Sequence, residues 1–279
     1  MHTHFRLAGV MGWPIAHSRS PKIHNHWLAQ HGLEGCYVPL AVAPDKLGAA
    51  LRALVPLGFA GCNLTIPHKE KALALVDRVE PFAQRIGAIN CVVVEADGSL
   101  TGKNYDAFGF ISSLKASAPR WRAEDAPAAV IGAGGGARAV VAGLVDAGVP
   151  EVRVFNRTLA RAQALAQDLG PPVKACPWEE RHAGLQGAGL VVNTTSLGMI
   201  GQLPLDLDLS SLPSGAIVAD IVYAPLETPM LAAARRVGLV TVDGLGMLLH
   251  QARPAFRDWF GVMPEATPAL RNLIAATIE

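Results

Sequence analysis

The sequence predicts an α/β protein of two domains, each with a mostly parallel sheet covered by helices. Short apolar stretches alternate with amphipathic helical stretches along the chain, which is the pattern of βαβ units. A looser polar stretch at residues 115–128 separates two series of such units. The length of 279 residues is sufficient for two hydrophobic cores.

The first series predicts four strands, with helices near residues 21–31, 44–57 and 69–77. The strands are expected in RLAGVMG at 6–12, CYVPLAV at 36–42, GCNLTI at 61–66 and INCVVVEA at 89–96. Pro67 is expected to be the first residue of the third helix. Lys69 then falls in the first turn, near the positive end of the helix dipole, where a cation is disfavoured. This unfavourable position makes Lys69 a candidate functional residue.

The second series predicts five more strands, and two helices near residues 245–260 and 268–278 follow the last of them. The strands are expected in AAVIGA at 128–133, EVRVFN at 151–156, GLVVNT at 189–194, AIVAD at 216–220 and LVTVDG at 239–244. The two final helices must pack on one of the two sheets.

The composition argues against several classes of protein. The net charge is +1, which indicates neither a nucleic-acid partner nor an acidic one. The start of the chain has no long apolar region typical of a signal peptide. No stretch approaches the roughly 20 apolar residues of a membrane span. We therefore expect a cytoplasmic protein that binds no membrane.

Cysteine and histidine usage predicts no disulfide and no metal site. The cysteines form no C-x-x-C pair and are expected to be buried free thiols of a reducing compartment; they are Cys36, Cys62, Cys91 and Cys176. The histidines are scattered. His24 and His26 are two residues apart, so they point to different sides of their helix and make a poor metal pair.

A glycine-rich turn predicts a dinucleotide-binding site. The stretch Gly132-Ala133-Gly134-Gly135-Gly136-Ala137 fits the pattern G-x-G-x-x-G/A, follows an apolar strand and opens a helix. Glycines there allow the tight turn and let backbone N–H groups approach a pyrophosphate at the helix N-terminus. The alternative is a turn without a ligand, but four glycines are a costly way to make only a turn.

The end of the next strand predicts NADP rather than NAD. An NAD site would place an acidic residue about 20 positions after the first glycine, whereas this strand ends in Asn156, Arg157 and Thr158. Thr158 is a good N-cap, and Arg161 then falls in the first turn of the helix. Two arginines beside a positive helix end favour an anion such as the 2′-phosphate. The alternative is a pair of solvated surface arginines.

Polar residues of the first half gather where strands end and helices begin, the place where open α/β sheets bind ligands. Ser18 and Ser20 could form a neutral clamp for a carboxylate at a helix N-terminus, although Ser20 could simply be the N-cap before Pro21. Thr65 lies four residues before Lys69 in the same segment, NLTIPHKE. Asn90 lies in an apolar strand and needs a partner. Asp106 precedes a helix, where it could also be an N-cap.

A series of short motifs along the chain closely resembles those of the shikimate dehydrogenase family. The matching motifs are GWPIAHSRSP, NLTIPHKE, GAIN, GKNYDAFG, IGAGGGAR, NRT, NTTSLGM, TPML and DGLGMLLHQA, in order from about residue 10 to residue 252. The glycine turn with NRT also resembles glutamyl-tRNA reductase, but that family lacks the PIAHSRSP and NLTIPHKE segments.

The resemblance implies reversible NADPH-dependent reduction of 3-dehydroshikimate to shikimate, in aromatic amino-acid biosynthesis, with the site in a cleft between domains. Residues 1–106 and 245–279 would form the substrate domain, and residues 107–244 a Rossmann-type NADP domain. Lys69 and Asp106 would be catalytic, and which of them moves the proton stays open. The implied substrate-binding residues are Ser18, Ser20, Thr65, Lys69, Asn90, Asp106, Tyr223 and Gln251. The cofactor residues would be the glycine turn, Asn156, Arg157, Thr158, Arg161, Asn193, Thr194, Thr195, Ser196, Gly244 and Met247.

One departure from the family pattern concerns the residue before Asp106, which is usually Thr and here is Tyr105. Its ring could crowd the substrate pocket or point away from it. Three alternatives remain: a quinate/shikimate dehydrogenase using NAD, an aminoshikimate-type dehydrogenase, and an NADP-binding sensor without catalysis. Ser20, where quinate-preferring relatives tend to carry Thr, argues against the first. The expected partner is a small-molecule substrate, and the chain would be a monomer or a homodimer.

Overall fold

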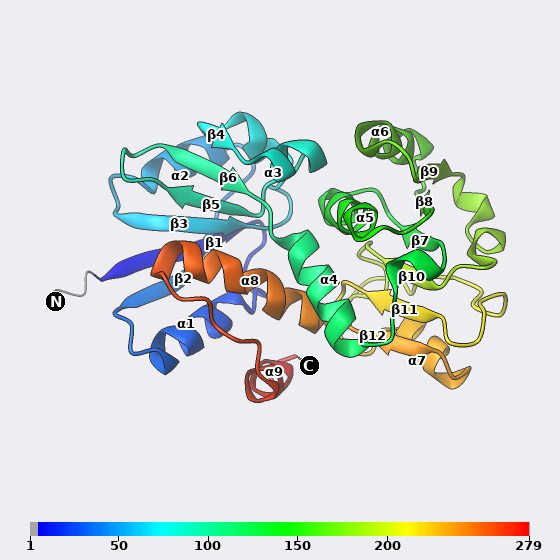
Figure 1. Ribbon diagram of the computed structural model, residues 1–279. Coiled ribbons are helices and arrows are strands. Elements are labelled where there is room, and N and C mark those ends of the chain that lie inside the picture. Colours follow the sequence, from blue (N-terminus) through cyan, green and yellow to red (C-terminus); the bar gives the residue numbers. More distant parts are fainter. Residues whose placement is uncertain (1–4, 279) are drawn as a thin grey trace. The chain divides into compact units, whose positions relative to one another are not determined.

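The computed structural model describes residues 5–278 and contains two compact units (Figure 1). The first unit consists of the described residues up to Tyr105 together with Gln251–Ile274, and the second consists mainly of Asp106–His250. Each unit has a six-stranded sheet with helices against it, which confirms the predicted α/β class. Within residues 5–278, no helix combines the length and apolar character needed to cross a membrane.

The sheet of the first unit has the strand order β2-β1-β3-β5-β6-β4. Strands β2, β1 and β3 run parallel, as do β4 and β6, whereas β5 is antiparallel to both of its neighbours. The bounds are β1 Arg6–Gly12, β2 Gly35–Ala41, β3 Phe59–Leu64, β4 Arg78–Val79, β5 Cys91–Val94 and β6 Leu100–Lys103. The sheet is therefore mostly parallel, as predicted, but the sequence pattern missed β4 and β6.

Helices of the first unit bury apolar side chains on the sheet. The helix α2 (Leu47–Ala53) contributes Leu47 and Leu51 to a core with Met11 and Leu64 of the strands. The other helices are α1 Ser20–Gln30, α3 Pro81–Ile86, the second part of α8 Gly244–Phe260 and α9 Pro268–Ala275. The final helices thus belong in large part to the first unit, since Gln251–Ile274 group with it.

The predicted helix over residues 69–77 is largely absent. Only Lys71–Ala74 form a short 3₁₀ helix. Pro67 follows a cis peptide bond within a turn, in which the His68 N–H donates to the Thr65 carbonyl at 2.9 Å. The imidazole of His68 is buried and its Nε2 lies 2.9 Å from the Val42 carbonyl oxygen. Lys69 therefore lies in a turn after β3, and the helix-dipole argument that singled it out is wrong.

A buried aromatic cluster joins α1 to the second part of α8. His24 stacks on Tyr37 with 4.0 Å between ring centroids, and Trp27, Phe256 and Trp259 surround it. Within residues 5–278, neither ring nitrogen of His24 has a hydrogen-bond partner. Burial lowers the pKa of His24 to about 3. The folded protein therefore keeps this imidazole neutral at a pH where an unfolded chain would protonate it.

His24 should make the protein sensitive to mild acid. The unfolded chain binds a proton below its ordinary pKa of about 6.5, while the folded chain does not until about pH 3. The contribution of neutral His24 to the free energy of unfolding is therefore fully present above about pH 6.5 and is lost as the pH falls. The free energy of unfolding should drop by about 2 kcal/mol between pH 7.5 and pH 5. Urea denaturation of the parent and of His24→Leu at both values measures it; an equal drop in both would contradict the assignment.

The sheet of the second unit is entirely parallel and has the order β12-β11-β10-β7-β8-β9. In chain order within this unit, that is the 3-2-1-4-5-6 arrangement of the Rossmann fold. The strands are β7 Ala128–Ile131, β8 Val152–Phe155, β9 Val173–Cys176, β10 Leu190–Asn193, β11 Ile217–Asp220 and β12 Val240–Val242. The Rossmann-type domain is confirmed, although β9 was not predicted.

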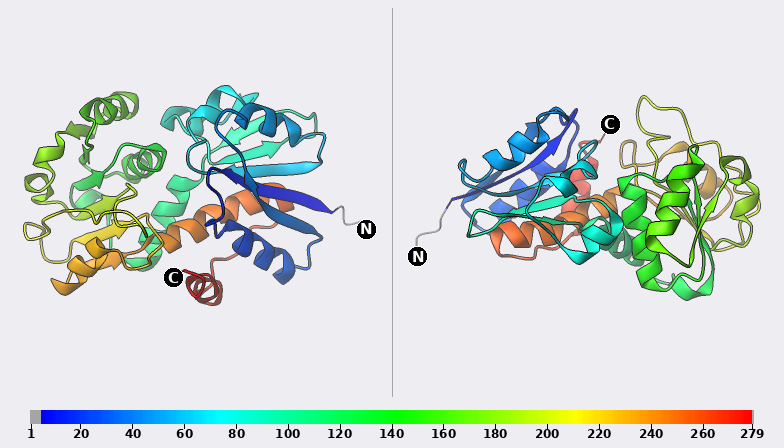
Figure 2. Two further views of the ribbon diagram at one scale, coloured as in Figure 1. Left: turned by 180° about the vertical axis from the view of Figure 1, so that it is seen from behind. Right: turned by 90° about the horizontal axis from the view of Figure 1, so that it is seen from above.

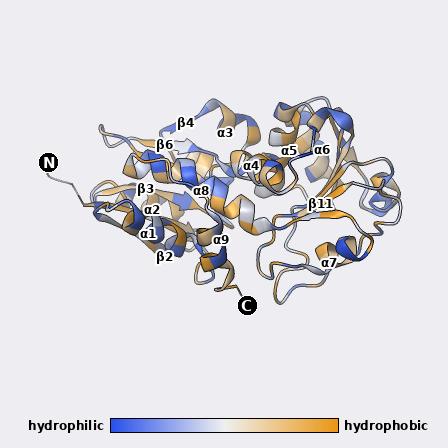
Figure 3. Ribbon diagram, turned by 60° about the horizontal axis from the view of Figure 1, so that its bottom comes forward, coloured by the Kyte–Doolittle hydropathy of each residue, from blue (hydrophilic) through white to orange (hydrophobic). Residues whose placement is uncertain are grey.

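Helices cover both faces of this sheet (Figures 1 and 2). Alternate strand residues form two cores: Val130 and Val154 pack with one set of helices, and Ala129 and Ile131 pack with the other. The helices are α4 Asp106–Ser117, α5 Gly135–Ala147, α6 Leu159–Leu169 and α7 Pro229–Arg236. Figure 3 shows β11 in the hydrophobic colour and α7 with both hydrophobic and hydrophilic segments, as expected for a buried strand and an amphipathic helix.

The cysteines are all free, but their burial was only partly predicted. Cys62 and Cys91 are buried, whereas Cys36 and Cys176 are partly accessible. Burial raises the pKa of the Cys91 thiol, so that thiol stays protonated. Within residues 5–278, no group of three or more His, Cys, Asp or Glu side chains is arranged to hold a metal ion.

Candidate functional site

The glycine turn of the second unit leaves open space at the N-terminus of α5. Gly132 has φ of 114°, and a Cβ there would lie 2.6 Å from Thr194 Oγ1, so only glycine fits. A Cβ at Gly134 would meet nothing within 4 Å. The N-cap residue of this helix, Gly134, has no side chain that could cap it, and the helix begins at Gly135. Its first N–H groups can therefore serve an anion such as a pyrophosphate.

The predicted 2′-phosphate residues follow β8, as expected. Asn156 Nδ2 donates to the Thr158 carbonyl at 2.8 Å, which closes the turn before α6. Thr158 is the N-cap by position, but its side chain makes no capping hydrogen bond. Arg157 and Arg161 are both exposed. The segment thus offers two accessible guanidinium groups near the start of α6.

The loop after β10 lies against the glycine turn. Thr194 donates to the Ile131 carbonyl through both its N–H, at 2.8 Å, and its Oγ1, at 2.7 Å. Asn193 Oδ1 accepts from the N–H and the hydroxyl of Thr195 at 3.0 and 2.7 Å. Predicted cofactor residues 193–195 are therefore held at the carboxyl edge of the sheet, beside Gly132.

Three further predicted residues lie in the second unit. Gly244 begins α8, and a Cβ there would approach the Ile221 carbonyl oxygen to 2.3 Å, so the chain needs glycine at this position. Met247 is 8% exposed and forms part of the hydrophobic core. Tyr223 is half-buried in the loop after β11.

In the first unit, Ser18 and Ser20 are linked by a hydrogen bond at the start of α1. Ser18 Oγ accepts from the Ser20 N–H at 3.3 Å, and the N-cap of α1 is Arg19, so Ser20 is the first helical residue. The N-cap alternative for Ser20 is therefore wrong. Thr65 follows β3, and its N–H donates to the Met11 carbonyl at 3.0 Å, which places the ends of β1 and β3 together.

Asn90 brings Gln251 and Tyr105 together. Asn90 comes just before β5 rather than within it, and is 2% exposed. Its Oδ1 accepts from the Tyr105 N–H at 2.8 Å, and its Nδ2 donates to Gln251 Oε1 at 3.2 Å. Two predicted substrate-binding residues, 161 positions apart in the chain, thus share a hydrogen bond.

Lys69 and Asp106 are each connected to the group formed by Asn90, Tyr105 and Gln251 through main-chain atoms. The Lys69 carbonyl accepts from the Ile89 N–H at 2.8 Å, directly before Asn90. Asp106 begins α4 and follows Tyr105 in the chain; its side chain is 4% exposed. The segment Ile89–Asn90 is therefore bonded to Lys69 and to the residue that precedes Asp106.

Tyr105 is engaged by helix α8. Its hydroxyl donates to Asp258 Oδ2, and Asp258 also pairs with Lys103 Nζ at 2.9 Å and Arg257 Nη2 at 3.1 Å. Burial raises the pKa of Tyr105, which therefore stays a neutral donor. Burial disfavours the Asp258 anion, but the Tyr105 hydroxyl and Lys103 outweigh it and keep the pKa of that carboxyl below its usual range.

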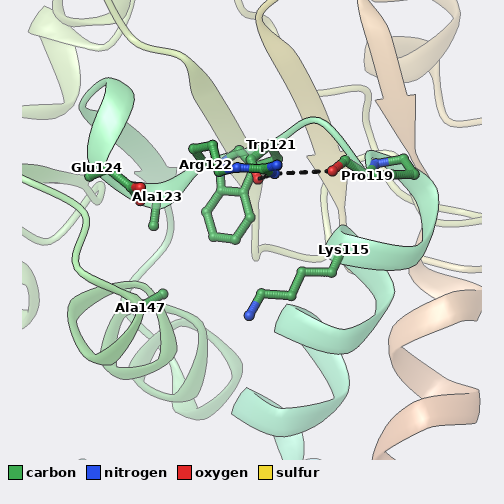
Figure 4. A pocket seen from close by; sticks show the side chains of 7 residues that line it. All are labelled: Lys115, Pro119, Trp121, Arg122, Ala123, Glu124 and Ala147. Atoms are coloured by element: carbon green, nitrogen blue, oxygen red, sulfur yellow. Dashed lines mark hydrogen bonds between the residues drawn. The ribbon is translucent and has the colours of Figure 1, made fainter.

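Two shallow depressions of the second unit share no residue with the predicted site. The smaller, about 350 Å³, lies between α4, α5 and the segment before β7 (Figure 4). The Arg122 guanidinium beside it is engaged by the backbone carbonyls of Pro119 and Trp121. The larger, about 540 Å³, is lined by residues that include Gly189 and Gly215, which precede β10 and β11. The larger depression therefore lies at the amino ends of these strands, away from the carboxyl edge.

Two family models match this chain. One is described as the shikimate dehydrogenase substrate binding domain and matches residues 10–92. The other, shikimate / quinate 5-dehydrogenase, matches residues 115–200. A shikimate dehydrogenase (NADP(+)) of Rhodospirillum rubrum is 58% identical over 273 residues, which cover 96% of each chain. The chain belongs to the shikimate dehydrogenase family.

Solved structures of this family have the same fold. Shikimate 5-dehydrogenase from Thermus thermophilus, in complex with NADP(H) and shikimate, is 40% identical with a TM-score of 0.86, covering 98% of this chain and 100% of that one. Quinate dehydrogenase from Corynebacterium glutamicum, in complex with NAD, is 33% identical with a TM-score of 0.90 and the same coverage. The family and the oxidoreductase class predicted from the motifs are confirmed.

The network around Tyr105 was missed by sequence reasoning. Lys103 and Asp258 are 155 positions apart, and their pairing leaves no spacing pattern. The only signal was the tyrosine itself, at a position where this family usually carries Thr. Its hydroxyl is bound by Asp258 on α8, which favours the alternative in which the side chain points away from a substrate.

Proposed function

We propose that this chain interconverts shikimate and 3-dehydroshikimate, with NADP as the hydride carrier. The observation that carries the proposal is the near full-length identity with relatives named shikimate dehydrogenase (NADP(+)), 58% in Rhodospirillum rubrum and 56% in Paramagnetospirillum magneticum. The Thermus thermophilus structure, 40% identical, contains both NADP(H) and shikimate. The predicted enzyme and cofactor agree with these names.

Two groups among the cofactor residues would have separate tasks. The N–H groups around Gly134 and Gly135 would hold the pyrophosphate, because the N-cap Gly134 has no side chain to compete for them. Arg157 and Arg161 would pair with the 2′-phosphate, since residues 156–161 contain no acid that would repel it. When bound, the nicotinamide supplies or accepts the hydride at C3 of the substrate.

The substrate residues would divide between the carboxylate and the ring hydroxyls. Ser18 and Ser20 would donate to the carboxylate, and Tyr223 would lie near it. Thr65, Asn90, Asp106 and Gln251 would bind hydroxyls. Because Asn90 Nδ2 donates to Gln251 Oε1, the Gln251 amide is held with its oxygen toward Asn90, and its nitrogen would donate to a substrate oxygen.

Lys69 and Asp106 would exchange the proton. In the reductive direction the ketone oxygen needs a proton as hydride reaches the carbon, and the Lys69 ammonium can donate it. In the oxidative direction the hydroxyl proton returns to this pair. Asp106 would orient Lys69 and accept from the substrate hydroxyl. Lys69 is half-buried, so its ammonium would meet the substrate with part of its water shell removed.

A comparison of the four combinations of acid and cofactor tests the proposed function. Initial rates of nicotinamide reduction are measured with shikimate or quinate and with NADP or NAD. We expect shikimate with NADP to give the highest kcat/KM. The result that favours a quinate dehydrogenase is a higher value with quinate and NAD, and NADP binding without turnover on either acid would favour a sensor.

Tyr105→Phe should lower the free energy of unfolding and change kcat only modestly. The change removes one donor to the half-buried Asp258 carboxylate, which costs about 1–2 kcal/mol of unfolding free energy. The hydroxyl is bound by Asp258 rather than by substrate, so kcat should change less than tenfold. Urea denaturation and steady-state kinetics measure both quantities. A hundredfold loss of kcat with unchanged stability would instead place the hydroxyl on the substrate.

A further inference from the structure

Asp220 is a buried carboxylate that the proposed mechanism does not use. It ends β11 and is 2% exposed. Asn193 Nδ2 donates to both of its oxygens, at 3.1 and 3.2 Å, the Thr228 hydroxyl donates at 2.8 Å, and the Val222 N–H donates at 2.9 Å. These donors are uncharged, and burial raises the pKa of Asp220 to about 6. A buried carboxyl that is held only by uncharged donors contributes little to the stability of the fold. The position of Asp220 therefore points to a role in the site.

The four hydrogen bonds join three segments at the carboxyl edge of the sheet. Asn193 begins the loop after β10, and its Nδ2 also donates to the Leu197 carbonyl at 3.0 Å. Val222 leads to Tyr223 in the loop after β11. Thr228 caps α7, where its Oγ1 accepts from the Leu231 N–H. Asp220 therefore fixes two loops and a helix start against one another.

The loop held by Asn193 contacts the glycine turn directly. Thr194 makes two hydrogen bonds to the Ile131 carbonyl, and its Oγ1 occupies the space that a Cβ of residue 132 would need. A displacement of Asn193 would thus be transmitted to the surroundings of Gly132. Asp220 is linked to this part of the site through its hydrogen bonds with Asn193.

We propose that Asp220 is a positioning residue that sets the loop 193–197 for cofactor binding and the loop 221–223 for substrate binding. This inference rests on the proposed function, because it takes residues 193–196 as part of the NADP site. Asp220 acts through the groups that it holds and touches neither ligand.

The test compares NADP binding and kinetics of three variants with the parent chain. Asp220→Ala removes all the acceptors. Asp220→Asn keeps one carbonyl oxygen for Val222 and Asn193, and its amide can donate to Thr228 Oγ1. Leu165→Ala is the matched control, because Leu165 is a fully buried side chain of α6 in the same unit. The readouts are the Kd for NADP by fluorescence titration, the KM for shikimate, and Tm.

We expect Asp220→Ala to raise the Kd for NADP roughly tenfold and to raise the KM for shikimate as well. Asp220→Asn should restore the Kd to within about threefold of the parent, and Leu165→Ala should lower Tm without changing the Kd. An Asp220→Ala chain that binds NADP as tightly as the parent would overturn the inference, as would Asp220→Asn being no better than Asp220→Ala. A parent chain that does not bind NADP would instead refute the proposed function.

Discussion

Lys69→Ala is expected to lower kcat for shikimate oxidation by roughly a hundredfold or more, because the substrate oxygen loses its proton-exchange partner. The fold should survive. Lys69 lies in a surface turn after β3, and its carbonyl, which accepts from the Ile89 N–H, is kept in the variant. Steady-state kinetics at saturating NADP measure the loss, and circular dichroism checks the fold.

Two control variants separate proton exchange from other effects. Lys69→Met keeps the aliphatic stem and should lose as much turnover as Lys69→Ala. Lys71→Ala removes a neighbouring exposed cation of the 3₁₀ helix and should keep the parent kcat. Near-parental turnover in Lys69→Met would remove Lys69 from the mechanism.

Replacing Arg157 and Arg161 together by Ala is expected to raise the KM for NADP by roughly a hundredfold. Each guanidinium would lose a charge-assisted contact with the 2′-phosphate, worth about 1.5–3 kcal/mol, or at least tenfold in affinity. The KM for NAD should change little, because NAD lacks that phosphate. Steady-state titration of both cofactors at fixed shikimate gives the two constants.

The control for this prediction is Arg120→Ala. Arg120 is also an exposed arginine of the second unit, but it lines the depression at the amino ends of the strands. It should leave both cofactor constants unchanged. An equal rise in the KM for NADP and for NAD in the double variant would show that the two arginines act on the shared part of the cofactor and not on the phosphate.

The strands that sequence analysis found are those with strong apolar patterns. The Rossmann strands β7, β10 and β11 are buried along their whole length, since helices cover both faces of the sheet, and they form apolar runs such as AAVI. The strands β4, β6 and β9 were missed because they are short and partly polar; β6 is LTGK, β9 is VKAC, and β4 contains only Arg78 and Val79. These strands form because they pair with neighbouring strands, and such pairing cannot be seen in a local sequence pattern.

The helix expected at residues 69–77 shows how a proline can mislead. Proline fits the first position of a helix and also a tight turn, and the residues around Pro67 do not distinguish the two. In the structure the His68 side chain is held by the Val42 carbonyl, on a segment far away in the chain. That contact favours the turn and has no signature in the local sequence.

The candidate site could be predicted from the sequence where a motif encodes its own backbone geometry. The glycine turn needs glycine for its φ and for the approach of Thr194, so it is visible from the sequence. The hydrogen bonds of Asp220, and the link between Tyr105 and Asp258, join residues from different loops and helices. Only the folded chain brings such residues together.

A double-mutant cycle tests whether Lys69 and Asp106 act as one proton-exchange unit. Turnover with shikimate and NADP is measured for the parent, Lys69→Met, Asp106→Asn and the double variant. We expect strong non-additivity, with the kcat of the double variant about equal to that of the slower single variant. If the fold losses of kcat in the two single variants multiply in the double variant, the two residues have independent roles and do not form one proton-exchange unit.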